Sequence, residues 1–139
     1  MRILAIVVLG GALVAAACGG GATGQDTAQT TIAVSLLDNG IKLDASSAPA
    51  GKVTLSVKNA GSVAHSLVVI KTNLDEGKMP AGAQDPSRVD ERGSVGTLGQ
   101  LQPNQTKDFT LDLAAGKYVI VCNEPGHYLM GMHTSFLVK

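Results

Sequence analysis

The sequence predicts an all-β protein, a Greek-key antiparallel β-sandwich of seven to eight strands. Short stretches with an apolar residue at every second position recur along the chain, and turn residues separate them. Seventeen glycines and only four aromatic residues favour a turn-rich fold with an aliphatic core. No segment shows the apolar stripe of a helix over three turns. Strands at this spacing are typical of a sandwich.

The first half of the chain contains four of these stretches. Residues 31–37 and 52–58 alternate apolar and more polar side chains. Residues 41–43 continue the first stretch after the turn at 38–40, which indicates a hairpin. Residues 67–70 form a continuous apolar run, as expected for a strand that is buried on both faces.

Four further strands are expected at residues 94–98, 107–113, 117–121 and 133–138. Between residues 71 and 100 the pattern breaks down into an irregular excursion with a helical turn. A loop of this length inside a compact domain has a function or packs over another part of the protein. The sequence leaves both roles open.

The chain divides into a signal peptide at 1–17, a tether at 18–30 and one domain at 31–139. An apolar run follows Arg2 and is too short for a membrane helix, which needs about 20 residues. It therefore predicts a secretory signal peptide. The tether is rich in small polar residues and is expected to be flexible.

Cys18 directly follows the expected cleavage site, as in the lipobox of bacterial lipoproteins. The resemblance implies that the Cys18 thiol becomes lipid-modified, which would anchor an exported, periplasmic or cell-surface protein to the membrane. The match is imperfect because Ala15 stands where a leucine is usual. Ordinary secretory cleavage before Cys18 is the alternative.

The charge balance excludes one class of partner. The chain has 11 basic and 11 acidic residues, and its lysines and arginines form no cluster. Nucleic-acid binding requires a basic surface that can pair with phosphates, so no nucleic-acid partner is expected.

The most specific motif is the stretch from Cys122 to Met132. It carries a thiolate, the imidazole of His127 and a thioether, separated by gaps of four residues, with a Pro125-Gly126 reversal between the first two. These are the donors of a blue-copper electron-transfer site, short of one more histidine. Met130 competes with Met132 as the thioether donor, but only Met132 preserves the gap of four.

The strand before Cys122 predicts where its sulfur lies. Tyr118, Ile120 and Cys122 share one face by period-two alternation, so the sulfur should enter the core. His65, at the start of a buried strand, is expected to approach from the neighbouring edge. An inert buried thiol and a surface histidine are the alternatives for Cys122 and His127 taken singly. His133 should face away from Met132, toward solvent.

Two segments resemble the cupredoxin family, and more narrowly small type 1 copper proteins such as auracyanin and rusticyanin. Residues 116–127 with Met132 are similar to the family's C-terminal half, and the segment from Val57 to His65 is similar to its first-ligand segment. The resemblance covers residues 31–139. It implies one type 1 copper ion per chain and a ligand set, which is His65, Cys122, His127 and Met132.

The resemblance also implies roles for neighbouring residues. The family often has Asn after the first histidine, where this chain has Ser66, as in rusticyanin. The carboxylate of Glu124 should favour Cu(II). The residues expected around the ligands are Asn59, Ala64, Ser66 and Glu124. Those expected to form a docking patch around His127 are Pro125, Gly126, Tyr128, Leu129 and Met130.

These features predict a one-electron carrier that exchanges electrons with redox proteins outside the cytoplasm. Four protein ligands leave the metal no open position, so neither a small-molecule substrate nor an enzymatic reaction is expected. A copper-binding or delivery module is the alternative. A cysteine nucleophile is disfavoured because no helix start is available to lower the thiol pKa.

Overall fold

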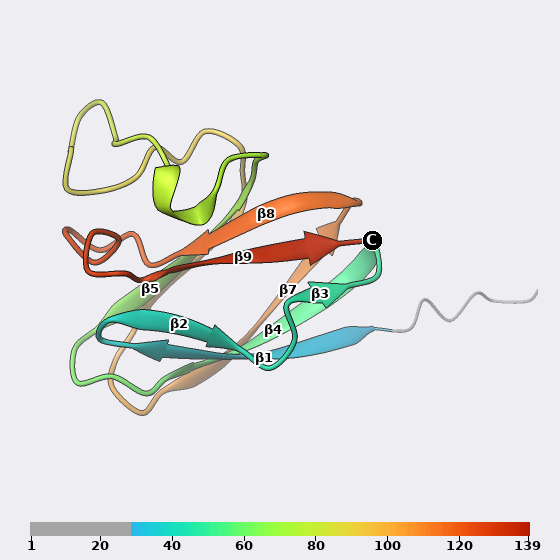
Figure 1. Ribbon diagram of the computed structural model, residues 1–139. Helices are drawn as coiled ribbons and strands as arrows, with labels where there is room; N and C mark the ends of the chain where they lie inside the picture. Colours follow the sequence, from blue (N-terminus) through green and yellow to red (C-terminus); the bar gives the residue numbers. More distant parts are fainter. Residues whose placement is uncertain (1–28) are drawn as a thin grey trace, which may run out of the picture.

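The computed structural model describes residues 29–139, which form two β-sheets packed face to face (Figure 1). The expected signal peptide, Cys18 and nearly all of the tether lie outside this range. The first sheet has the strand order β2-β1-β4-β7, and the second has the order β3-β9-β8-β5-β6.

The strands of the first sheet are β1 (Thr30–Leu37), β2 (Gly40–Leu43), β4 (Gly51–Asn59) and β7 (Thr106–Leu113). Those of the second are β3 (Ser47–Ala48), β5 (His65–Lys71), β6 (Ser94–Leu101), β8 (Gly116–Val121) and β9 (His133–Val138). The described part of the chain contains no helix with the length and hydropathy that a membrane span requires.

The predicted β-sandwich is confirmed, with two additions. β1 pairs with β4 in parallel, from Thr30 opposite Val53 to Leu36 opposite Asn59, so the first sheet is mixed. β3 pairs in parallel with β9 at the edge of the second sheet. β3, the strand that the sequence did not predict, has only two residues, which is too short to show alternation in the sequence. The hairpin of β1 and β2 is confirmed.

The side chains between the sheets follow the predicted alternation. β1, β4, β5, β8 and β9 each contribute alternate residues to one apolar core, and Tyr118, Ile120 and Cys122 of the β8 segment lie in it together. The sulfur of Cys122 is therefore carried inward at the end of β8, as expected. The core residues of β1, β4 and β5 are Ile32, Val34, Leu36, Val53, Leu55, Val57, Leu67 and Val69.

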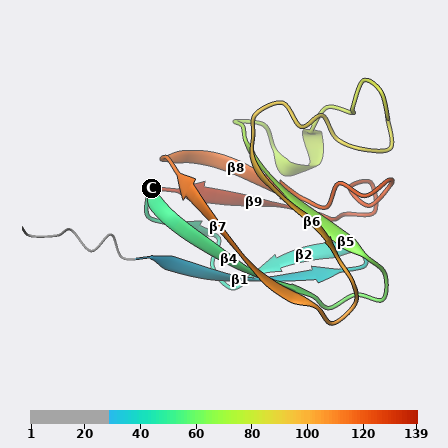
Figure 2. The ribbon, with the colours of Figure 1, turned by 180° about the vertical axis from the view of Figure 1, so that it is seen from behind.

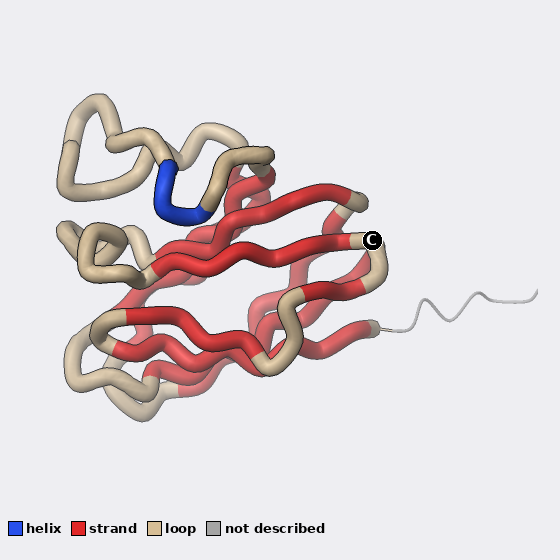
Figure 3. The backbone as a smooth tube through the Cα atoms, viewed as in Figure 1, coloured by secondary structure: helices blue, strands red, loops and turns tan. Residues whose placement is uncertain are grey.

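The outer face of β5 and β8 is covered as well. Val68 and Ile70 of β5 form a second apolar cluster with Val119 and Val121 of β8. Met79, Val89 and Tyr128 complete this cluster from the far side. The excursion between β5 and β6 thus packs over this face, and it includes the expected helical turn, η1 (Glu76–Lys78) (Figures 2 and 3). Of the two roles that the sequence left open for this loop, the structure shows the second, packing over another part of the protein.

Tyr128 connects the excursion to the loop of residues 122–132, which carries three of the expected ligands and is called the ligand loop below. Its hydroxyl donates a hydrogen bond to the carbonyl of Glu76 at 2.8 Å and accepts one from the N–H of Met79 at 3.0 Å. The Tyr128 ring also lies against the His133 ring, with centroids 4.9 Å apart. His133 is therefore half-buried beside Tyr128, not solvent-facing as expected.

Replacing Tyr128 with phenylalanine should loosen this cover. Tyr128→Phe leaves the buried N–H of Met79 without its acceptor, which costs about 1–3 kcal/mol. Urea unfolding of the metal-free protein should show this loss in the free energy of unfolding.

Tyr118→Phe is the matched control, because the Tyr118 hydroxyl makes only one bond, to the carbonyl of Ala114 at 2.7 Å. It should cost less than Tyr128→Phe, about 0.5–1.5 kcal/mol. Equal unfolding midpoints for Tyr128→Phe and the parent protein would contradict the role given to Tyr128.

Candidate metal centre

Three of the predicted ligand residues meet at the end of the sandwich. The Nδ1 atoms of His65 and His127 are 3.1 Å apart, and the Sγ of Cys122 lies 3.8 Å from the first and 3.4 Å from the second. A point in the plane of these three atoms lies about 2 Å from each, close to the bond lengths of protein-bound metals. Within residues 29–139 they are the only such group of histidine, cysteine or acidic side chains.

Met132 lies at the base of the same loop. The N–H of Cys122 donates to the carbonyl of Met132 at 3.0 Å, which places the two residues opposite one another. The Met132 side chain is fully buried in the inner core, whereas Met130 is 54% exposed. Burial therefore favours Met132 as the thioether nearer the three ligand atoms.

Glycines allow the ligand loop to turn where the sequence predicted. Gly126, after Pro125, has φ 79°, in the left-handed region that side chains avoid. Gly131 has φ 100°, and a Cβ there would lie 3.1 Å from the carbonyl oxygen of Asn39 in the β1–β2 turn. The loop and this turn therefore touch closely.

Asn59 holds the loop that delivers His65. Its side chain is fully buried and donates to the carbonyls of Val63 at 2.8 Å and Leu101 at 2.9 Å. Its amide oxygen accepts from the N–H of Gly61 at 2.9 Å. Every polar atom of this side chain is thus used to shape residues 60–64, in which half-buried Ala64 precedes His65.

Burial sets the charge states of the donors in the metal-free site. It raises the pKa of the Cys122 thiol, while the N–H groups of Glu124 and Ser66 and the Ser66 hydroxyl oppose this shift. Burial, followed by the nearby His65, lowers the pKa of His127. An uncharged thiol and imidazole are favoured, and a cation bound between them would favour the thiolate.

The two histidines differ in their surroundings. His65 is fully buried, and its Nε2 lies 3.1 Å from the Oδ1 of Asp38. The hydroxyl and N–H of Ser62 hold the pKa of Asp38 at about 2. His127 is half-exposed, and among the described residues its Nε2 is neither hydrogen-bonded nor buried, so it reaches solvent.

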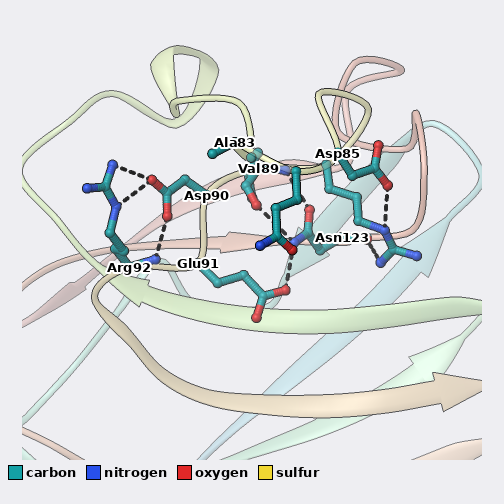
Figure 4. Close-up of a pocket in the computed structure, with 10 residues that line it drawn as sticks. Ala83, Asp85, Val89, Asp90, Glu91, Arg92 and Asn123 are labelled. Atoms are coloured by element: carbon teal, nitrogen blue, oxygen red, sulfur yellow. Dashed lines mark hydrogen bonds and ion pairs between the residues drawn. The ribbon is translucent and has the colours of Figure 1, made fainter.

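Asn123 also belongs to the site, although no pattern in the sequence marks it. Its buried side chain accepts from the N–H of Val89 at 2.8 Å and donates to Glu91 at 2.7 Å (Figure 4). Arg88 donates to the carbonyl of Asn123 at 2.6 Å. These hydrogen bonds connect the excursion to Asn123, the residue next to Cys122. A surface groove of about 580 Å³ lies over Asn123, lined by charged side chains that largely pair with one another.

The expected docking residues divide into two groups. Leu129 is 75% exposed, Met130 and Pro125 are also exposed, and Gly126 is half-buried. Tyr128 instead points under the excursion and is 9% exposed. Of the remaining expected residues, Ser66 is buried beside the thiol, and the half-buried Glu124 accepts a hydrogen bond from Gln100 at 2.9 Å.

Comparison with known proteins agrees with this geometry. The family model of the sulfocyanin (SoxE) domain matches residues 41–139. No curated protein matches the chain. The reduced auracyanin of Roseiflexus castenholzii is 26% identical, with a TM-score of 0.59, and the match covers 79% of this chain and 97% of that one.

Two further structures share the fold at lower identity. Auracyanin A of Chloroflexus aurantiacus is 24% identical with a TM-score of 0.55, and the match covers 80% of this chain and 99% of that one. Rusticyanin of Thiobacillus ferrooxidans is 21% identical with a TM-score of 0.55, and the match covers 80% of this chain and 77% of that one.

The chemistry of the donors fits the metal of such proteins. One thiolate, two imidazoles and a buried thioether suit a type 1 copper ion far better than a hard cation, which prefers oxygen ligands. The protein therefore belongs to the sulfocyanin (SoxE) domain family and is a small blue-copper protein with the cupredoxin fold.

Proposed function

We propose that this protein is an extracytoplasmic one-electron carrier that holds its copper ion with His65, Cys122, His127 and Met132. The observation that carries the proposal is the convergence of three ligand atoms from two distant segments on one point. A bound type 1 copper ion supplies a one-electron couple between Cu(II) and Cu(I).

The scaffold supports this role by holding the ligands still. Asn59 fixes the loop before His65, and Asn123 fixes the loop after Cys122. Ligands held by packing and hydrogen bonds move little when the charge at the centre changes. Four protein ligands would also leave no position for a substrate, which supports a carrier over an enzyme.

Electrons would reach a partner protein through His127. Its ring is half-exposed, and apolar Leu129 and Met130 stand exposed next to it in the loop. A small apolar surface suits brief contact with redox proteins, since it can be desolvated without breaking salt bridges. Exchange of the copper ion itself, as a delivery module requires, is less well supported because His65, Cys122 and Met132 are all fully buried.

The ligand assignment predicts a specific optical result. The copper-loaded protein should show intense visible thiolate-to-copper absorption, and Cys122→Ser should abolish it, because the alkoxide donor of serine gives no such transition. An unchanged spectrum in Cys122→Ser would rule out this sulfur as a ligand.

Met132→Gln tests the fourth ligand in the same preparation. The variant should keep the colour and lower the reduction potential by about 59 mV or more, a tenfold change in relative Cu(II) affinity, because an amide oxygen favours Cu(II). Met130→Gln, at an exposed methionine, is the control and should leave the potential unchanged.

The docking surface predicts a change in rate without a change in potential. Leu129→Ser should slow electron self-exchange between copies by about fivefold, since it removes apolar contact worth on the order of 1 kcal/mol. Leu137→Ser, at an exposed leucine in β9, should have no effect. NMR line widths of mixtures of the reduced and oxidised protein measure both rates; equal rates for the two variants would exclude the Leu129 surface.

The proposal includes a lipid on Cys18, outside the described residues. The lipid and the tether would confine the domain to a membrane surface and raise its effective concentration near membrane redox partners. Mass spectrometry of the mature N-terminus should find acyl chains on Cys18, and Cys18→Ala should move the protein to the soluble fraction. A mature N-terminus without acyl mass would refute the anchor.

A further inference from the structure

A carboxylate from the opposite sheet contacts the buried histidine of the metal centre. Asp38 lies in the turn between β1 and β2, and its Oδ1 is 3.1 Å from the Nε2 of His65. The His65 ring is fully buried, whereas the Asp38 side chain is 47% exposed. The carboxylate therefore reaches the back of a ring that solvent and partner proteins cannot reach.

The contact determines which nitrogen of His65 carries its proton. An ionised carboxylate only accepts hydrogen bonds, so Nε2 must be the donor. The Nδ1 of the neutral ring is then left with a lone pair, directed at the Cys122 sulfur and His127 Nδ1. Asp38 thus selects the tautomer that can bind a metal at Nδ1.

Asp38 is held in place by a second set of contacts. The N–H of Ser62 lies 2.8 Å and 3.0 Å from the two carboxylate oxygens, and the Ser62 hydroxyl donates to Oδ2 at 2.7 Å. Ser62 belongs to the same loop that delivers His65. The carboxylate therefore ties the β1–β2 turn to this loop and to the ring at once.

The chain also leaves room for this contact. A Cβ at Gly61 would lie 2.2 Å from Asp38 Oδ1 and 2.6 Å from His65 Nε2, so any side chain there would push the two groups apart. On the other side of the turn, Asn39 touches Gly131 of the ligand loop closely. Two glycines thus permit the turn to sit against the site.

We infer that Asp38 is a positioning residue that fixes the His65 tautomer and whose negative charge favours Cu(II) over Cu(I). The inference rests on the proposed role of His65 as a ligand. Carboxylate partners of metal-bound histidines orient the ring and raise its basicity. Among residues 29–139, no carboxylate is hydrogen-bonded to His127, so the two rings differ in their partners.

Asp38→Asn tests the charge with almost no change in shape. In the copper-loaded protein it should weaken the affinity for Cu(II) relative to Cu(I) by about tenfold, which raises the reduction potential by 59 mV. Asp44→Asn is the matched control. Asp44 lies just beyond the other end of β2 and is exposed. It accepts a hydrogen bond from the N–H of Ala33 at 2.9 Å but contacts no histidine. The reduction potential of Asp44→Asn should equal that of the parent protein.

A second measurement does not depend on copper. The ¹⁵N shifts of His65 in the metal-free parent protein should report a ring protonated at Nε2, and Asp38→Ala should convert part of it to the Nδ1 tautomer. Urea unfolding of each variant separates a tautomer change from loss of the fold. Asp38→Glu, which keeps the charge, should retain most of the parent potential.

The results separate this inference from the proposed function. Equal potentials in Asp38→Asn and Asp44→Asn, or an Nδ1-protonated His65 in the parent protein, would overturn the role of Asp38 while leaving the blue-copper spectrum intact. Loss of the ligand assignment would instead appear as a parent spectrum that Cys122→Ser does not change.

Discussion

The closure of the ligand loop by one backbone hydrogen bond is the constraint on which the site depends. The N–H of Cys122 donates to the carbonyl of Met132, where β8 and β9 begin to pair. This bond brings both ends of an eleven-residue loop onto the same rigid ladder. The sulfur of Cys122 and the side chain of Met132 therefore enter the core together, and His127, between them, faces β5, the strand that begins with His65.

The excursion between β5 and β6 completes this constraint from outside. It covers Val119 and Val121 on the outer face of β8, grips Asn123 and is fastened by the Tyr128 hydroxyl. Without that cover, β8 would be half-solvated, and the ligand loop would be held from one side only. A packed interior resists small displacements, so cover on both faces of β8 keeps the ligand atoms at fixed separations.

Local patterns in the sequence account for much of this architecture. Period-two alternation predicted strands such as β1 and β4, and a continuous apolar run predicted β5. The alternation also predicted that the Cys122 sulfur enters the core. The parallel pairing of β1 with β4 and the two-residue β3 left no periodic signal. No pattern in the sequence marks the roles of Asp38 and Asn123, because these come from contacts with residues 24 to 35 positions away. A polar residue beside a turn looks the same with or without such contacts. Tyr128 was expected at the surface because of its place beside His127, but its side chain turns inward.

The two histidines of the centre lie in different surroundings. His65 is fully buried, and its Nε2 contacts the Asp38 carboxylate. The ring of His127 reaches solvent, and in the proposed function a partner approaches this ring. A charge that acts through the buried ring can set the preference for Cu(II) without adding a charge to the exposed apolar side chains of Leu129 and Met130. In the proposed function, the affinity for a partner and the reduction potential would therefore depend on different residues.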